Sequence, residues 1–153
     1  MILFADTSAL VKIYLEEEGS DRMTFEANRC QLAISLLAFP EASATFARRV
    51  REGLLSRAER DALQQRMLED GDGWVRVPVN PDVVERCPIL CTNHALHGGD
   101  AVQLASALLL ADHGLDVRFA ASDERLLRAA REEGLSVLDP ALQPESLAVH
   151  EPG

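Results

Sequence analysis

Hydrophobic residues occur along this 153-residue chain in two patterns, short continuous runs and longer helical spacings. Short runs bounded by turn residues are typical of buried strands, and apolar positions three and four residues apart are typical of helices. We expect strands at 2–5, 32–36, 74–77, 117–120 and 137–138. We expect helices over 7–15, 20–29, 39–52, 56–69, 100–113 and 124–133, and one starting at Asn80-Pro81 that Pro88 should kink or shorten.

This alternation of strands and helices predicts an α/β fold. Strands that alternate with helices form parallel sheets, which helices cover on both faces. We therefore expect residues 1–142 to form a three-layer α/β/α domain with a central parallel sheet of about four to five strands. Residues 143–153 contain prolines, and we expect them to form a loose C-terminal tail.

The composition fits one globular domain, because 47% of the residues are hydrophobic and 26% are charged. The formal net charge is −10, which disfavours indiscriminate nucleic-acid binding by a basic surface. Such binding draws its affinity from Lys and Arg side chains that release counterions from phosphate. A nucleic-acid enzyme that carries metal ions remains compatible with this charge.

The cysteines, Cys30, Cys87 and Cys91, are odd in number, and we expect no export signal because only residues 1–5 precede the first acid. A disulfide framework is therefore not expected, and a reducing cytoplasm is the expected location. No apolar run reaches membrane-spanning length, so we expect no membrane association.

Four acidic residues, Asp6, Glu41, Asp100 and Asp123, each interrupt an apolar segment where we expect a strand to give way to a helix. Any one of them can be explained as a helix cap or a first-turn residue. The carboxyl ends of parallel strands, however, meet at one edge of a sheet, where open α/β sheets bind ligands. Carboxylates gathered there repel one another unless a cation joins them. The pattern therefore predicts one shared metal site.

The motifs around these acids resemble those of the PIN-domain ribonucleases, most closely the VapC-like toxins of toxin–antitoxin pairs. In chain order they are D-T-S at 6–8, Glu41 after the second strand, D-A-x-x-L-A at 100–105 and S-D-x-x-L at 122–126. The resemblance covers roughly residues 1–140 with its order and approximate spacing intact. A lone D-T-S is a weak signal, whereas the ordered set is fairly specific.

The resemblance implies a PIN-like nuclease domain whose four acids bind Mg²⁺ or Mn²⁺ and cleave RNA phosphodiester bonds. Both are hard cations that favour carboxylate and water oxygens, and a pair of them stabilises the attacking water and the leaving oxygen at phosphorus. Asp6 and Asp100 are expected to be the principal metal ligands. Glu41 and Asp123 are expected to hold a second ion or to position water.

The resemblance also implies partners and substrate contacts. The partners are an RNA substrate, a cognate antitoxin and a second copy of the chain in a homodimer. Ser8 is expected to orient a carboxylate or contact phosphate, and Ser122 to replace a hydroxyl that relatives often carry at the position of Ala121. Arg125 and Arg128 follow Asp123, and the usual interpretation of such residues is a solvated helix face with local salt bridges; the alternative, which we take for Arg125, is an RNA path to the metal site. The same two interpretations apply to Lys12, Arg48, Arg49 and Arg51.

Two other functions stay open. The first is a non-catalytic PIN-like module that binds RNA or protein, which Ala121 weakly favours and the presence of all four acids disfavours. The second is an aspartate-based phosphatase, which also begins with a strand that ends in Asp. That chemistry needs another Asp two residues later, where this chain has Ser8.

A second cluster of potential ligands consists of Cys87, Cys91, His94 and His97. Zinc binds such side chains, but four ligands on one helical stretch cannot easily surround the ion tetrahedrally. The preferred interpretation is buried cysteines followed by histidines in a loop. His97 as a general base near Asp100 is a further alternative.

Overall fold

The structure, a computed structural model, describes residues 1–142. Its elements in chain order are β1 (Ile2–Ala5), α1 (Thr7–Leu10) with a 3₁₀ helix (Val11–Ile13), α2 (Ser20–Arg29), β2 (Gln31–Ser35), α3 (Ala38–Arg51), α4 (Arg57–Gly71), β3 (Val75–Val77), α5 (Pro81–His94), α6 (Gly98–Asp112), β4 (Val117–Ala120), α7 (Glu124–Glu132) and β5 (Ser136–Leu138). The tail predicted at 143–153 lies outside the described residues.

The strands form one parallel sheet of five strands in the order β3-β2-β1-β4-β5, which places β1 at the centre. Leu3, Phe4 and Ala5 of β1 are fully buried, as expected for a strand covered on both faces. Ala5 pairs with Ala120 of β4, so these two central strands end level with each other. Whatever follows each strand therefore emerges at the same edge of the sheet.

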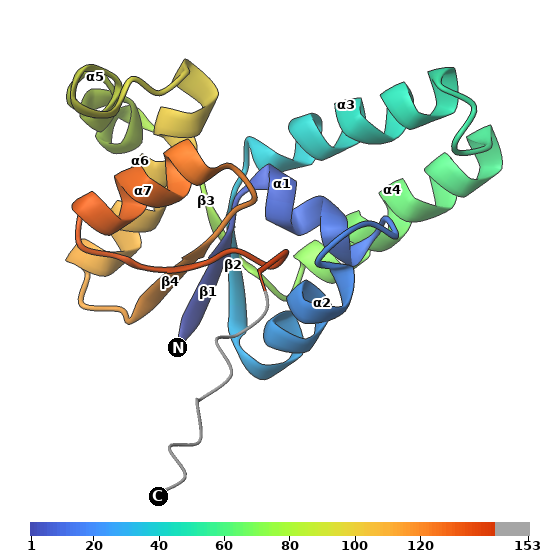
Figure 1. The fold of residues 1–153 in the computed structure, drawn as a ribbon, viewed down its shortest axis with the longest axis horizontal. Coiled ribbons are helices and arrows are strands. Elements are labelled where there is room, and N and C mark those ends of the chain that lie inside the picture. The colour runs from blue at the N-terminus through green and yellow to red at the C-terminus, as the bar shows by residue number, and fades with distance from the viewer. Residues whose placement is uncertain (143–153) are drawn as a thin grey trace, which may run out of the picture.

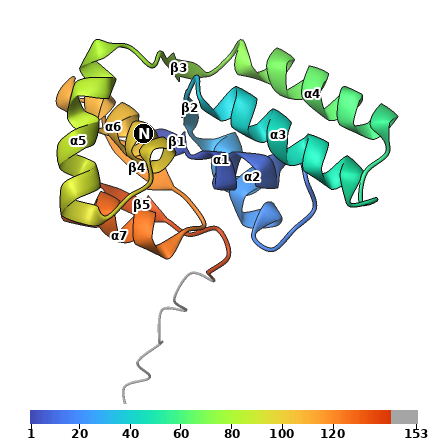
Figure 2. The same ribbon diagram turned by 90° about the horizontal axis from the view of Figure 1, so that it is seen from above.

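Helices cover both faces of the sheet, which confirms the predicted three-layer α/β/α class (Figure 1). On one face α5, α6 and α7 pack around Leu104 and the stacked rings of Phe4 and Phe119, whose centroids lie 5.6 Å apart. On the other face α1, α2, α3 and α4 enclose Leu10 and Phe46. Seen from above, α3 and α4 lie side by side as a hairpin that extends beyond the sheet (Figure 2).

Two elements differ from expectation. Residues 7–15 are not one helix, because the α-helical turn passes at Val11 into a 3₁₀ helix and Tyr14 lies beyond it. The hydroxyl of Tyr14 donates a hydrogen bond to Asp70 at 2.7 Å, a tertiary contact that local spacing does not predict.

Pro88 does not shorten α5, which continues past it to His94. Pro88 and Val84, whose carbonyl loses its helical partner, both have exposed side chains. The lost backbone hydrogen bond therefore falls on the outer side of the helix, where it costs least. Within residues 1–142, none of the helices combines the length and apolar character that spanning a membrane requires.

Replacing Phe46 by Ala tests the core assignment. Phe46 is fully buried and its ring meets Tyr14 edge-on, with the centroids 6.4 Å apart. The change Phe46→Ala should lower the free energy of unfolding by about 3–5 kcal/mol, through lost burial and the cavity left behind. Urea unfolding followed by circular dichroism measures it. Phe25→Ala is the control, because Phe25 is 56% exposed and should lose less than about 1 kcal/mol. Equal losses would contradict the assignment.

Candidate active site

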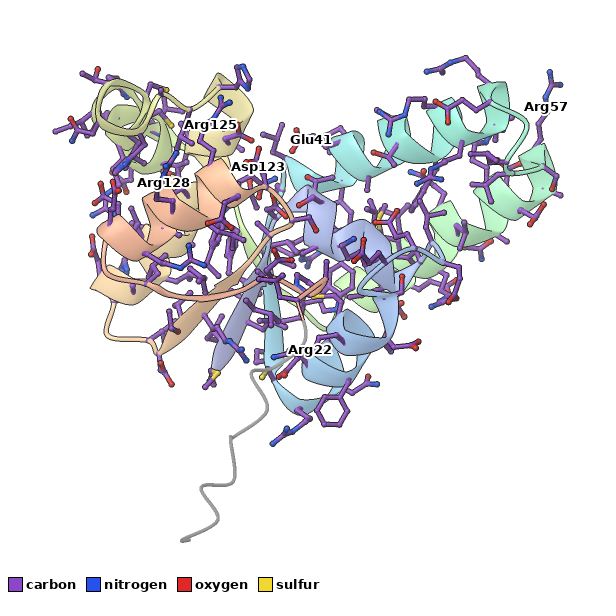
Figure 3. The ribbon with its side chains drawn as sticks, viewed as in Figure 1. Arg22, Glu41, Arg57, Asp123, Arg125 and Arg128 are labelled. Carbon is purple, nitrogen blue, oxygen red and sulfur yellow. The ribbon has the colours of Figure 1, made fainter. Side chains whose placement is uncertain are left out.

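A cavity of about 380 Å³ lies at the edge of the sheet where β1 and β4 end. We call it the acidic cavity, and its lining residues are Asp6, Thr7, Ser8, Val11, Glu17, Glu41, Thr45, Arg48, Arg49, Asp100, Gln103 and Asp123. All four acids that the sequence predicted as one site are among them. Glu41 and Asp123 approach the same region from α3 and α7 (Figure 3).

Three of the acids arrive as predicted, directly after a strand or in the helix that follows it. Asp6 follows β1, Glu41 lies in the first turn of α3 after β2, and Asp123 precedes α7 after β4. Asp100 is different, because it lies in the first turn of α6 and the preceding element is α5. The expectation that a strand precedes it is wrong. Helices that cover a parallel sheet run opposite to the strands, so the start of α6 still reaches the carboxyl edge.

Asp6 and Asp123 cap helices and line the cavity at the same time. The Asp6 Oδ1 atom accepts hydrogen bonds from the backbone N–H of Ala9 at 3.0 Å and the hydroxyl of Ser8 at 2.6 Å. The Asp123 Oδ1 atom accepts from two backbone N–H groups at the start of α7, the shorter bond being 2.8 Å. The cap interpretation is thus correct for both, but it uses only one oxygen of each carboxylate.

Glu41 is also held by one oxygen. The hydroxyl of Thr7 donates to Glu41 Oε1 at 2.8 Å, and the side-chain amide of Gln103 donates to the same atom at 2.9 Å. Among residues 1–142, no hydrogen bond reaches the second oxygen of Asp6, Glu41 or Asp123. Three elements therefore each direct a carboxylate into the cavity with one oxygen left for a ligand.

Sequence reasoning missed the roles of Thr7 and Gln103. The signal for Thr7 was its position next to Asp6 in the D-T-S motif. The signal for Gln103 was its spacing from Asp100, because residues three apart lie on the same face of a helix.

Burial, with a contribution from neighbouring negative charges, disfavours ionisation of Asp6 and Asp100. Asp6 is only 6% exposed, and burial raises its pKa to about 7, with the charges of Asp100 and Glu41 adding to the effect. Hydrogen bonds from Ser8 and Ala9 act in the opposite direction. Burial, and then the charge of Asp123, also raises the pKa of Asp100. A cation in the cavity would offset this concentration of negative charge.

The acids form an all-oxygen donor set, the kind that Mg²⁺ and Mn²⁺ prefer. They do not yet enclose an ion: across the described part of the chain, no three acidic, histidine or cysteine side chains are grouped closely enough to hold one. The donor chemistry therefore fits a hard divalent cation, with the carboxylates arranged around the cavity wall.

The other predicted site residues lie in different places. The hydroxyl of Ser8 faces the acidic cavity and accepts a hydrogen bond from the backbone N–H of Ser122 at 2.9 Å. Arg48 and Arg49 line the acidic cavity. Arg125 does not.

Arg125 lies instead in a separate cavity of about 330 Å³, which we call the basic cavity. Its lining residues are Thr92, Asn93, His94, Ala95, Arg125, Arg128, Ala129 and Glu132. Lys12 is buried and bonded to Glu17 at 3.1 Å, so it forms an internal ion pair.

The cluster of cysteines and histidines does not converge on a zinc site within residues 1–142. Cys87 donates to a backbone carbonyl within α5, and its thiol is half-buried with Cys91. His94 ends α5 instead of lying in a loop, and its ring contacts two carboxylates of α7 at 3.1 and 2.7 Å. His97 is 86% exposed, with Nδ1 3.6 Å from Asp100 Oδ2.

Comparison with known proteins finds relatives by sequence and solved structures with the same fold. Ribonuclease VapC45 and Ribonuclease VapC49 of Mycobacterium tuberculosis, from strains CDC 1551 / Oshkosh and ATCC 25618 / H37Rv, are each 37% identical to the chain over 145 residues. The match covers 94% of this chain and 99% of each relative. A chain of a toxin–antitoxin complex from Klebsiella pneumoniae has the same fold, with a TM-score of 0.65, 21% identity and coverage of 92% of this chain and 98% of its own. No family model matches.

The substitution Asp6→Asn tests the electrostatics of the cavity in metal-free protein. The folded state binds the Asp6 proton more tightly than the unfolded chain, because burial raises the pKa from 3.8 to about 7. The stabilising contribution is present below the lower value and is lost as pH rises to the higher one. The thermal stability of the variant relative to the wild type should therefore increase as the pH rises from about 4 to 7 and should stay constant above pH 7. Melting curves in EDTA measure this, and a difference that is constant with pH would contradict it.

Proposed function

Since the chain belongs to the VapC ribonucleases, we propose that its acidic cavity is the active site of a metal-dependent endoribonuclease, the toxin of a toxin–antitoxin pair. One observation carries this proposal: four acids from four separate elements line one cavity at the carboxyl edge of the sheet. The family membership confirms the resemblance that the ordered motifs indicated.

Asp6, Glu41, Asp100 and Asp123 are the proposed ligands of Mg²⁺ or Mn²⁺. When bound, such ions activate water and stabilise the leaving oxygen at phosphorus, so that no side-chain nucleophile is needed. The all-oxygen donor set supports the assignment, as do the oxygens of Asp6, Glu41 and Asp123 that have no hydrogen bond in the described residues. The pKa of Asp6, raised by burial, supports it too, because a nearby cation stabilises the ionised form.

The chain's own residues hold these groups and position water in the proposed reaction. Ser8 and the backbone N–H of Ala9 fix the orientation of Asp6. Asp123 is exposed, whereas Asp6 is buried and Glu41 is half-buried, so Asp123 is the acid best placed to orient the attacking water. Water adds to phosphorus, the bond from phosphorus to the leaving ribose oxygen breaks, and that oxygen takes up a proton.

The basic cavity is the proposed path of the RNA strand next to the acids. Among the described residues, the guanidinium groups of Arg125 and Arg128 have no acidic partner, and Figure 3 shows both on α7 beyond Asp123. Unpaired guanidinium groups are suited to grip phosphate oxygens. The backbone N–H of Ser122 secures the loop before α7 by donating to Ser8, which ties this path to the acidic cavity.

A cognate antitoxin is the proposed partner, by analogy with the toxin–antitoxin complex from Klebsiella pneumoniae. A basic side chain of that partner would neutralise the acidic cavity. The homodimer stays a prediction from the resemblance, and the cytoplasmic location stays a prediction from the cysteine content. The phosphatase alternative gains no support, because Ser8 at the position of the required second Asp is bonded to Asp6.

Cleavage of RNA by purified, antitoxin-free protein tests the function. Incubation of mixed structured RNAs with the protein in Mn²⁺ should yield defined fragments, and EDTA should abolish them. Asp100→Asn should slow cleavage more than about 100-fold, because even groups that only orient metal ligands cost 10–100-fold when removed. Asp82→Asn is the control, since Asp82 is exposed and lies in the first turn of α5, outside the acidic cavity. Undiminished cleavage by Asp100→Asn would contradict the proposal, and Mn²⁺ binding without cleavage would favour the non-catalytic module.

Removal of the arginines tests the RNA path. The double change Arg125→Ala and Arg128→Ala should raise KM for RNA. It should also reduce the slope of log affinity against log salt concentration by about 1–2, because a protein with fewer phosphate contacts releases fewer counterions when it binds RNA. Arg57→Ala is the matched control: Arg57 is also exposed and lacks an acidic partner within the described residues, but Figure 3 shows it at the far tip of the α3–α4 hairpin. An effect of Arg57→Ala that is half that of the double change, and so equal for each arginine removed, would show that the arginines act only through overall charge.

A further inference from the structure

We infer that Gln103 is a positioning residue for Glu41. Its side-chain amide, together with the hydroxyl of Thr7, holds one carboxylate oxygen of Glu41 and leaves the other to face a divalent cation. This inference deepens the proposed function and rests on it, because it explains how one of the proposed metal ligands is aimed.

The three side chains form a closed set of hydrogen bonds. Gln103 Nε2 lies 2.9 Å from Glu41 Oε1 and 3.1 Å from Thr7 Oγ1, and Thr7 Oγ1 lies 2.8 Å from the same Glu41 oxygen. The amide thus gives one proton to each neighbour, while the Thr7 hydroxyl accepts one bond and donates one. The reverse orientation of the amide would place its oxygen against the carboxylate, so the direction of donation is fixed by chemistry.

The other end of the amide shows what this arrangement costs. Gln103 is only 3% exposed, and its Oε1 atom is buried without a hydrogen-bond partner in the described residues. Such an unsatisfied group costs about 1–3 kcal/mol. Ser106 on the same helix is fully buried too, but its hydroxyl donates to the carbonyl of Val102 at 2.7 Å, whereas Gln103 Oε1 has no such partner in the described residues. A buried polar atom without a hydrogen-bond partner is unfavourable for the fold, and such exceptions are expected at functional sites.

The free oxygen of Glu41 points to the neighbouring acid. A Cβ atom built on Gly99 would lie 3.5 Å from Glu41 Oε2, which places this oxygen beside the first turn of α6. Asp100 is the next residue of that turn. The bonds to Oε1 therefore turn Oε2 toward the position where Asp100 enters the acidic cavity.

Metal binding by the full chain, free of antitoxin, tests the inference. Gln103→Leu removes both donors at similar volume and also removes the orphaned oxygen, so the fold should persist with an unchanged or higher Tm. Calorimetry should give a Kd for Mn²⁺ that is about 10–100-fold higher, and the electron paramagnetic resonance spectrum of the bound ion should change. For RNA cleavage, kcat should fall with KM unchanged. Gln64→Leu is the matched control, because its amide donates to Ser43 at 2.7 Å outside the acidic cavity.

A Glu41→Gln background separates positioning from a general structural role. Once position 41 lacks a carboxylate, adding Gln103→Leu should weaken Mn²⁺ binding further by less than about twofold, since both changes act on one interaction. The inference is overturned if folded Gln103→Leu binds Mn²⁺ as tightly as the wild type. It is also overturned if Gln103→Leu lowers the Mn²⁺ affinity of the Glu41→Gln variant as much as it lowers that of the wild type. Gln103→Met, which also lacks donors, replaces Gln103→Leu if the latter does not fold. Wild-type protein that binds no Mn²⁺ would overturn the proposed function as well.

Discussion

Repulsion among four carboxylates gathered at one edge of a parallel sheet is the constraint on which the rest of the structure depends. The pairing of β1 with β4 brings Asp6 and the loop of Asp123 to this edge, and the helices that return across the sheet add Glu41 and Asp100. The starts of α3, α6 and α7 present the positive ends of their dipoles here, which offsets part of the repulsion. Burial raises the pKa of Asp6 to about 7, and the charges of Asp100 and Glu41 add a smaller contribution in the same direction.

The fold gives three of the acids, Asp6, Glu41 and Asp123, two roles each. One oxygen of Asp6 and one of Asp123 satisfy backbone N–H groups that every helix start leaves without partners. One oxygen of Glu41 joins α3 to α1 and α6 through side-chain bonds. These hydrogen bonds therefore set the orientation of the three carboxylates, and the second oxygen of each is available to bind a ligand. The same hydrogen bonds therefore serve the fold and the orientation of the acids.

Much of the architecture follows from local patterns, whereas part of the site does not. The strands and helices, and the convergence of Asp6 and Asp123, follow from apolar runs and helix-start chemistry that neighbouring residues determine. The bonds of Gln103 join residues 62 and 96 positions apart in the chain, so no local pattern contains them. Asp100 was found through its motif but placed after the wrong kind of element, because the direction in which a helix crosses the sheet is a property of the fold. Likewise, α5 continues past Pro88 because the side of the helix that carries this proline is exposed, and that exposure is a property of the fold.

The most direct test of the account is anomalous diffraction from crystals of the protein soaked in Mn²⁺. The account predicts a peak in the acidic cavity within direct coordination distance of Asp6, Asp100 and the Glu41 oxygen that the hydrogen bonds leave free. The carboxylates should have moved toward one another, because they do not enclose an ion in the described residues as they stand. A well-ordered cavity without a peak at saturating Mn²⁺, or a peak only at other acidic residues of the chain, would contradict the central claim.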